Sequence, residues 1–418
     1  MLTGKGYKDR VLSDDEIKEI CLAVLDPVKN EKLLFIIPDH TRTAPTGLLF
    51  REIYRAIVPA SDHVDFLIAL GTHPPMTEKM ILERVGITHE EWHSRYSKAR
   101  FFNHHWDDPS QLGSAGILSK SEMSEISEGL LEREVNVTVN KMVLKYDRLI
   151  IAGPVFPHEV VGFSGGNKYL FPGIAGEEII HFFHWLGALI TNMEIIGKIN
   201  TPVRRVVDRA ADLLQKPVDC LAMVVENGQL AGLFGGESRE AWLEAARLSE
   251  QLHIIYKDRP FERVLSCAPR MYDDLWTGAK CMYKLEPVVA DGGEVIIYAP
   301  HITELSVTHG EKIMQIGYHV RDYFLKQWDR FKDFPGGIMA HSTHVKGAGT
   351  YIDGVEKPRI QVTLATSIPE SVCGKIDLGY RDPASIDPHE WMNRETEGIF
   401  YVPKAGEQLF RIKSERSD

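Results

Sequence analysis

The sequence predicts an α/β protein made of two α/β domains with mainly parallel sheets. Short apolar runs alternate with amphipathic segments, which is typical of parallel strands covered by helices. The chain has 418 residues, more than a single hydrophobic core usually supports. We expect domains over residues 1–258 and 259–418, with the last residues packing back on the first domain and the active site in the cleft between them.

The first expected helix begins at a capping box, Ser13-Asp-Asp-Glu16. The spacing of Ile17, Ile20, Cys21 and Val24 then places four apolar side chains on one face of that helix. The helix is therefore expected to pack on a sheet.

Three buried strands are expected in the first domain, each followed by a polar loop. The carboxyl ends of parallel strands share one edge of a sheet, so the three loops should converge on a ligand site there. The strands are residues 33–37, 63–70 and 147–153, their loops begin at Pro38, Gly71 and Pro154, and helices are expected over 47–59 and from near Thr77.

The second domain is expected to begin after a linker at residues 256–260. Further apolar runs indicate a second α/β unit with helices between its strands. The expected strands are residues 264–267, 294–298 and 337–340.

Charge and composition exclude several classes of protein. A formal charge of -11 argues against a nucleic-acid partner, which would require a basic surface. The N-terminus has no apolar segment typical of a signal peptide, and no run approaches the roughly 20 apolar residues that span a bilayer. The five scattered cysteines lack metal-site spacing and suit reduced thiols. We therefore expect a cytoplasmic protein without a membrane partner.

The Gly-rich segment from Phe156 to Gly176 is the most informative part of the sequence. It places His158, Ser164, Gly165, Gly166 and Lys168 between a strand and a helix. Glycines let the backbone approach a ligand closely, and the helix N-terminus expected near Ala175 offers N–H groups to a phosphate. The alternative interpretation is purely structural: these residues form a Gly-rich turn that binds no ligand.

Histidines and an arginine add possible chemistry at the expected sheet edge. The loop Asp39-His-Thr-Arg42 offers a carboxylate and a guanidinium, and Arg42 suits a substrate carboxylate or a cofactor phosphate. His73 ends the second strand, where it can titrate near neutrality as an acid or a base. His181 and His184 lie one helical turn apart. The roles of these two and of the pair His104 and His105 stay open at this point.

Standard nucleotide-binding signatures are absent from the expected positions. Gly166-Asn-Lys168-Tyr169 lacks the order of a Walker motif, and no GxGxxG follows the first strand. Any redox cofactor must therefore be held in another way.

Taken together, the segments DHTR, GTH, HEVVGFSGGNKYLFPGIAG and HFFH resemble the lactate racemase family in order and spacing. In that family a nickel-pincer nucleotide (pyridinium-3,5-bisthiocarboxylic acid mononucleotide carrying nickel) lies between two α/β domains and accepts hydride reversibly from a 2-hydroxy acid. The resemblance implies that Lys168 bonds covalently to this cofactor, that His184 is the nickel ligand, and that His73 and His158 are the paired acid/base residues.

The resemblance also implies binding roles for residues of both domains. Cofactor contacts are implied for Asp39, Arg42, Ser164, Gly165, Gly166, Trp276 and Thr277, and substrate contacts for Arg42, Lys280 and Thr277. Trp276 and Thr277 replace a Tyr-Gln pair of lactate racemase, so longer hydroxy acids and sugar acids join lactate as possible substrates.

The expected partners are a small anionic hydroxy acid and the enzymes that assemble the cofactor, while the oligomeric state stays open. Two other interpretations use the same residues. The first is a zinc hydrolase or lyase built from His73, His158, His184 and Asp39. The second is a sugar-acid binding protein without catalysis.

Overall fold

The computed structural model describes residues 1–413, which pack as two units. Unit 1 comprises residues 1–156, 163–180 and 199–252, and unit 2 comprises residues 157–162, 181–198 and those from 253 onward. The chain therefore passes from one unit to the other five times. This division differs from the single boundary expected at residues 258/259, because two short segments of the first half pack with the second unit.

Unit 1 contains a seven-stranded sheet in the order β1-β11-β10-β7-β2-β3-β4. The five strands from β10 to β4 are parallel, and at one edge β11 runs antiparallel to both of its neighbours, β10 and β1. The strands are β1 (Thr3–Gly6), β2 (Leu33–Pro38), β3 (Val64–Ala69), β4 (Ala99–Asn103), β7 (Arg148–Pro154), β10 (Val218–Glu226) and β11 (Gln229–Glu237).

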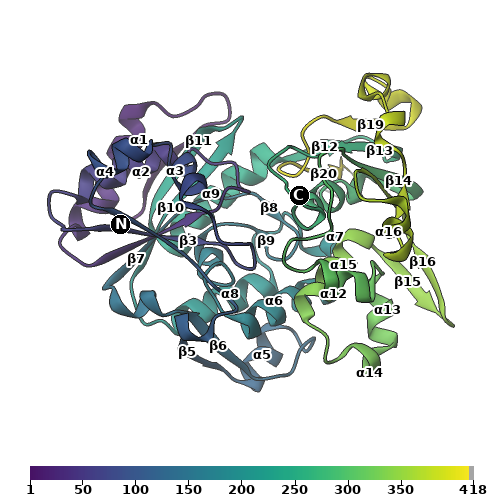
Figure 1. Cartoon of the computed structure of the whole chain (residues 1–418), viewed down its shortest axis with the longest axis horizontal. Coiled ribbons are helices and arrows are strands. Elements are labelled where there is room, and N and C mark those ends of the chain that lie inside the picture. The colour runs from purple at the N-terminus through teal and green to yellow at the C-terminus, as the bar shows by residue number, and fades with distance from the viewer. Residues whose placement is uncertain (414–418) are drawn as a thin grey trace. The chain divides into compact units, whose positions relative to one another are not determined.

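Helices cover both faces of this sheet, and Figure 1 shows α1 to α4 gathered on one side of it. The helices are α1 (Asp14–Leu25), α2 (Thr46–Ile57), α3 (Glu78–Val85), α4 (His89–His93), α5 (Lys120–Ile126), α8 (Pro202–Asp212) and α9 (Ser238–His253). The strands β5 (Leu112–Leu118) and β6 (Val135–Asn140), which flank α5 in the chain, form a separate antiparallel pair. The capping box at Ser13 forms as predicted, and α1 buries Ile17, Ile20, Cys21 and Val24. The apolar spacing of this helix therefore predicted its core face.

Unit 2 contains a five-stranded sheet in the order β18-β17-β14-β13-β19, and every neighbouring pair in it is parallel. Its strands are β13 (Phe261–Cys267), β14 (Val289–Ala299), β17 (Gln361–Thr366), β18 (Gly379–Tyr380) and β19 (Ile399–Val402). A second small sheet pairs β12 (Ile254–Lys257) with β20 (Leu409–Ile412). The end of the chain thus pairs with residues that lie just before the expected domain boundary.

The remaining elements of unit 2 are mostly short helices. They are α7 (Asn192–Ile195), α10 (Leu275–Gly278), α11 (Lys280–Tyr283), α12 (Gly310–Ile316), α13 (Arg321–Lys326), α14 (Trp328–Phe331), α15 (Gly336–Lys346) and α16 (Glu370–Lys375), with the strands β8 (Pro157–His158), β15 (Gly349–Ile352) and β16 (Val355–Pro358). Helix α6 (Glu177–Ile190) begins in unit 1 and continues into unit 2.

The strand expected over residues 337–340 is wrong, because these residues lie in helix α15. Every residue from Gly337 to Lys346 is buried, so the helix has no polar face to reveal its period. A short apolar run does not distinguish a buried strand from a buried helix.

Two observations concern the expected location of the protein. No helix within residues 1–413 is both long and apolar enough to cross a bilayer. All five cysteines are buried free thiols.

Candidate active site

The sheet of unit 1 has a topological switch point between β2 and β7. From β2 the chain continues outward to β3 and β4, whereas β7 and β10 lie on the other side of β2. Ligands of open α/β sheets bind beside the carboxyl ends of strands at such a point. The loops after β2, β3 and β7 carry Asp39, His73 and Lys168, as the sequence predicted for this edge.

Asp39 and His73 form a direct pair in unit 1. Oδ1 of Asp39 accepts hydrogen bonds from the Thr41 amide (3.1 Å) and hydroxyl (2.8 Å), and Oδ2 faces Nδ1 of His73. Burial opposes ionisation of Asp39, but the charge and hydrogen bond of His73, together with Arg42 and Thr41, outweigh it. They hold the pKa of the Asp39 carboxyl far below its ordinary value.

This pairing assigns the protons of His73. A carboxylate only accepts hydrogen bonds, so Nδ1 of His73 must carry a proton and donate it to Asp39. In the neutral ring Nε2 is then unprotonated, which is the form that a general base requires; in the doubly protonated ring the positive charge helps to keep Asp39 ionised.

Arg42 belongs to the same group of charges. It acts electrostatically on Asp39 and on Tyr169, which directly follows Lys168. Burial raises the pKa of the Tyr169 phenol above its ordinary value, so this side chain stays neutral. Charged and polar side chains of the loops after β2 and β7 therefore interact electrostatically.

The glycines of the Gly-rich segment are required by the protein's own packing. Gly165 has φ +85°, and a Cβ there would lie 2.5 Å from Val155; one on Gly166, at φ +56°, would lie 2.9 Å from Trp242. The carbonyl of Ser164 accepts the indole N–H of Trp242 at 2.8 Å, and its hydroxyl accepts the amide of Phe156 at 2.9 Å. The structure thus gives Ser164, Gly165 and Gly166 a structural role that fixes the turn.

Lys168 lies in the short helical turn Gly166–Tyr169 that this packing holds in place. Every other residue from Val161 to Pro172 is buried, whereas Lys168 is only partly buried. Lys168 is thus the one partly exposed residue of an otherwise buried turn.

Two of the histidines left open have partners that explain them. Nε2 of the buried His104 donates to the Ala175 carbonyl at 2.9 Å, and burial lowers the pKa of His104 to about 4. His104 therefore anchors the turn before α6 as a neutral ring. Nδ1 of His181 accepts the amide of Gly337 at 3.2 Å, which ties α6 to α15 within unit 2.

His158 belongs to unit 2 and is 5% exposed. Its Nδ1 accepts the Val160 amide at 3.1 Å and lies 3.3 Å from the Glu159 carboxylate. An amide can only donate, so in the neutral ring the proton is on Nε2. When the ring is doubly protonated, Glu159 is the group that can pair with Nδ1–H.

His184 lies on α6, one turn beyond His181, and its ring meets the Phe183 ring edge-on at 4.3 Å between centroids. It is partly buried. A partly exposed imidazole on a regular helix is a chemically suitable ligand for nickel.

Unit 2 has its own switch point, between β13 and β19. Trp276, Thr277 and Lys280 follow β13 on α10 and α11. The Thr277 hydroxyl donates to the capping carboxylate of Asp274 at 2.9 Å, so this hydroxyl has a structural partner. Lys280 is 7% exposed, with Nζ 4.4 Å from the centre of the Tyr272 ring.

Two histidines beside Trp276 were missed in the sequence. His341 stacks on Trp276 at 4.1 Å and 8°, and His309 lies 4.5 Å from the same ring. Nε2 of His341 donates to the Trp276 carbonyl at 3.3 Å, and burial lowers the pKa of His341 to about 3. His341 lies on the helix mistaken for a strand, so no sequence signal pointed to it.

A group of three metal-ligating side chains occurs once within residues 1–413, at His319, Glu356 and Asp377. Lys346 forms an ion pair with Asp377 at 2.6 Å, which opposes a bound cation. None of the four residues considered for zinc belongs to this group.

Relatives of known name match much of this chain. A family model described as the lactate racemase N-terminal domain matches residues 23–196. The lactate racemase of Thermoanaerobacterium thermosaccharolyticum is 24% identical over 313 residues, covering 70% of this chain and 67% of that protein. The lactate racemase of Lactiplantibacillus plantarum is 27% identical over 180 residues, covering 42% of this chain and 36% of that protein.

Solved structures extend the similarity to nearly the whole chain. A crystal structure of a protein from Thermotoga maritima is 33% identical, with a TM-score of 0.90 over 97% of this chain and 100% of that one. The lactate racemase apoprotein of T. thermosaccharolyticum shares the fold at 18% identity, with a TM-score of 0.71 over 98% of this chain and 94% of that one. With these matches and the segments around Asp39, His73 and Lys168, the chain belongs to the lactate racemase family and is an isomerase.

Proposed function

We propose that this protein is a racemase or epimerase that inverts C2 of a 2-hydroxy acid or sugar acid. His73 and His158 are the acid/base pair, Lys168 is the covalent attachment point of a nickel-pincer nucleotide, and His184 is its nickel ligand. Membership of the lactate racemase family supports the racemase activity.

The observation that carries the proposal is the exposure of Lys168. A buried turn, held by Trp242 and two clash-limited glycines, presents one amine at the switch point of the unit 1 sheet. Near it lies the Asp39–His73 pair, which has the geometry of an oriented general base. A lysine placed on such a tightly packed turn is poorly explained by solubility alone.

The residues present fit the proposed cofactor chemically. Lys168 supplies an amine for the tether, His184 an imidazole for nickel, and Arg42 a guanidinium for a phosphate. Asp39, Ser164, Gly165, Gly166, Trp276 and Thr277 are the further contacts proposed for it. When bound, the nickel-pincer nucleotide would supply reversible hydride acceptance from C2 of the substrate, a redox step for which side chains alone have no equivalent.

The protein's own groups then move protons and hold the substrate. The unprotonated Nε2 of His73 takes the hydroxyl proton of one enantiomer, and His158 returns a proton on the other face. Arg42 and Lys280 bind the substrate carboxylate, and Thr277 contacts it. These contacts fix the orientation of C2 relative to the two histidines. For the opposite enantiomer the two histidines exchange roles.

The side chains at the switch point of unit 2 bear on the substrate class. Trp276, in contact with the rings of His309 and His341, gives this region a different polarity from a Tyr-Gln pair. Longer hydroxy acids and sugar acids are therefore proposed alongside lactate. Cofactor-assembly enzymes are the proposed partners, and the five reduced thiols support a cytoplasmic location.

Intact-mass and metal measurements on protein made in a host with the cofactor-assembly enzymes test the proposal. We expect nickel together with a covalent adduct that Lys168→Ala removes. Zinc without an adduct would favour the hydrolase or lyase, and neither metal nor adduct would favour a binding protein. Either of these results would overturn the proposal.

The substrate is identified with the same material. A panel of 2-hydroxy acids and sugar acids, followed by chiral chromatography, should reveal at least one acid whose C2 is inverted. Loaded protein that inverts none of them would contradict the proposed activity.

A further inference from the structure

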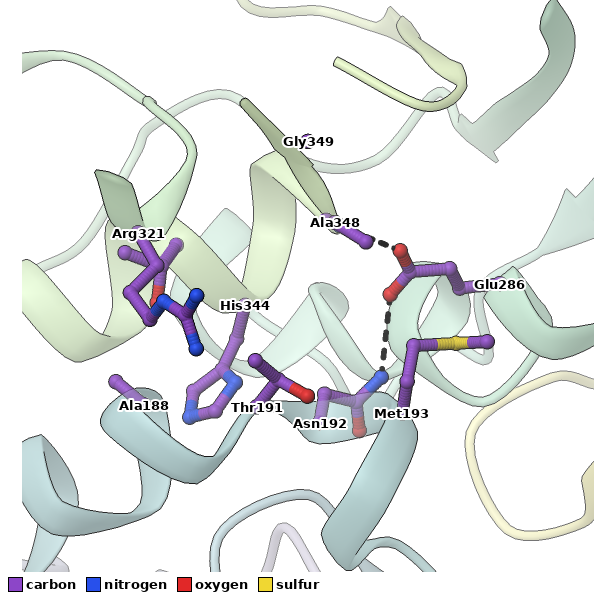
Figure 2. Close-up of a pocket in the computed structure, with 11 residues that line it drawn as sticks. Ala188, Thr191, Asn192, Met193, Glu286, Arg321, His344, Ala348 and Gly349 are labelled. Atoms are coloured by element: carbon purple, nitrogen blue, oxygen red, sulfur yellow. Dashed lines mark hydrogen bonds between the residues drawn. The ribbon is translucent and has the colours of Figure 1, made fainter. Parts of the chain in front are cut away.

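Unit 2 contains a cavity of about 150 Å³ between the ends of α6 and α15 (Figure 2). This space exceeds the roughly 30 Å³ of a single water molecule, so it suits a small solute. Its polar lining comes from Thr191, Asn192, Glu286, Arg321, Thr343 and His344. None of the lining residues is among those proposed for the reaction.

His344 contributes a buried imidazole without a hydrogen-bond partner. The residue is 4% exposed, and its Nε2 makes no hydrogen bond although it is fully buried. Burial lowers the pKa of His344 to about 4, so the ring is neutral. An unpaired buried polar group costs stability, and a ligand that pairs with the ring would remove that cost.

Arg321 lies beside this imidazole with donors to spare. Its Nε and Nη2 donate to Asp322 at 3.2 and 3.1 Å, and Nη1 donates to the Leu189 carbonyl at 2.9 Å. A guanidinium has five N–H groups, so one on each terminal nitrogen is left for a ligand. Such a forked pair matches a carboxylate.

The opposite side of the cavity offers acceptors. Figure 2 shows Glu286 across from Arg321 and His344, bonded to the Ala348 amide at 2.6 Å and to Asn192 at 3.3 Å. Glu286 is fully buried, and burial raises the pKa of its carboxyl. A carboxyl that resists ionisation suits a hydroxyl partner better than an ammonium group.

Thr191, between these two sides, has a strained backbone. Its φ of 92° and ψ of 149° are in a region that β-branched residues rarely adopt. Strain of this kind destabilises the folded backbone and concentrates at ligand clamps. The cavity therefore combines an unpaired imidazole with a strained wall.

We propose that this cavity binds a small hydroxylated carboxylate, with the carboxylate on Arg321 and His344 and hydroxyls toward Glu286 and Asn192. The charge of Glu159 acts on His344, and Glu159 also faces His158. A ligand on His344 would thus be subject to the field of a carboxylate that faces a proposed acid/base residue. The binding itself does not depend on the proposed activity.

Calorimetry on the full chain without cofactor tests the site, with D-glycerate and D-gluconate as probes. At least one should bind at millimolar concentration, and propionate and glycerol should bind at least tenfold more weakly. Serine replaces the 2-hydroxyl of glycerate with an ammonium group and should also bind at least tenfold more weakly. Equal binding of propionate or serine would overturn the assigned ligand class.

Variants separate this cavity from the proposed reaction site. His344→Phe and Arg321→Met should each weaken binding at least tenfold, whereas Arg330→Met, on an exposed arginine outside the cavity, should not. His344→Phe keeps a planar aromatic ring, with the adjoining cavity to take its extra atom, and removes the unpaired polar atom, so its melting temperature should not fall. Thr191→Gly should weaken binding while raising the melting temperature, because it relieves the strained backbone.

Two results would overturn the proposal. The first is no binding of either probe to folded protein at about 10 mM, a concentration that detects even weak association. The second is binding that Arg42→Ala abolishes and His344→Phe leaves intact, since that ligand would lie at the proposed reaction site.

Discussion

The two proposed acid/base histidines are held in opposite ways. His73 follows a strand of unit 1 and donates Nδ1–H to the buried carboxylate of Asp39, which Thr41 fixes. His158 lies in a hairpin segment of unit 2 and accepts the Val160 amide at Nδ1, with Glu159 3.3 Å away. One ring is anchored by a charge and the other by its own backbone.

Because of this difference, two histidines can begin a reaction with one ring ready to accept a proton and the other ready to donate one. The anchor of His73 leaves Nε2 ready to accept a proton, whereas the anchor of His158 keeps the proton of the neutral ring on Nε2. Interconverting two enantiomers requires one acceptor and one donor at a time. The two anchors assign those roles to the resting protein.

Removing either ring should have the largest effect. His73→Ala and His158→Ala should each lower kcat by about 100- to 10,000-fold, the usual contribution of acid/base catalysis. The double variant should be little worse than either single variant, because the two rings act in one sequence. Chiral chromatography gives the rates, and intact mass should show that the adduct on Lys168 persists. Racemisation at the wild-type rate by either single variant would refute the two-histidine assignment.

Neutralising the anchor of His73 should have the next largest effect. Asp39→Asn keeps the shape but offers an amide that can donate to Nδ1, which favours the wrong tautomer and lowers kcat by about 100-fold. KM should change less than kcat, since the ring acts on the proton and Arg42 holds the carboxylate. Asp39→Glu is the control that keeps the charge and should recover part of the rate. A normal rate in Asp39→Asn would show that the carboxylate does not orient His73.

Neutralising Glu159 should have a smaller effect. The Val160 amide still fixes the His158 ring in Glu159→Gln, so we expect a loss of about tenfold or less. Nitrogen NMR of the protein without cofactor should show the Nδ1–H tautomer for His73 and the Nε2–H tautomer for His158, both in the wild type and in Glu159→Gln. A loss equal to that of Asp39→Asn would remove the contrast between the two anchors.

Acid sensitivity should distinguish the two units by the smallest margin. Burial lowers the pKa of His104 in unit 1 to about 4, and those of His341 and His344 in unit 2 to about 3 and about 4. Between about pH 6.5 and the lowered pKa of each ring, the unfolded chain binds a proton that the folded chain does not, so the free energy of unfolding falls by about 1.4 kcal/mol per pH unit for each ring.

Denaturant unfolding at pH 7 and pH 5 measures this loss. The difference in unfolding free energy between pH 7 and pH 5 should be smaller by about 2 kcal/mol in His344→Phe and in His104→Phe. It should be smaller by about twice that when both rings of unit 2 are replaced. An unchanged pH dependence in His344→Phe would mean that this ring is protonated in the folded protein.

Much of the site could be predicted because it follows strand ends. The apolar runs before Asp39, His73 and Pro154 have strand length and β-branched or aromatic content, and parallel topology then places their loops on one edge. The orienting bond between Asp39 and His73 could not be predicted, since a pairing across 34 positions depends on tertiary packing.

Other features failed for identifiable reasons. The antiparallel hairpin of β10 and β11 turns at Asn227-Gly228, with positive φ at both residues, which is a recognised hairpin signal that the prediction did not use. Helix α15 is buried along nearly its whole length, so neither its type nor its histidines could be read from periodicity. The passage of residues 157–162 and 181–198 into unit 2 has no local sequence signal, because it depends on tertiary packing.

The repeated passage of the chain between units affects how the protein is made. Residues 181–198 carry Phe182, Phe183, Trp185 and Leu186, all buried in the finished fold, and apart from residues 157–162 the rest of their unit begins at residue 253. At about 5–20 residues per second, synthesis from residue 198 to the last strand takes roughly 10–40 s. During that interval the apolar aromatic side chains of residues 181–198 have left the ribosome, but most of the unit that buries them has not been synthesised. We therefore expect chaperones that bind exposed apolar segments to bind the nascent chain there. Because both units are discontinuous in the sequence, neither can be expressed or transferred to another protein as one continuous gene segment.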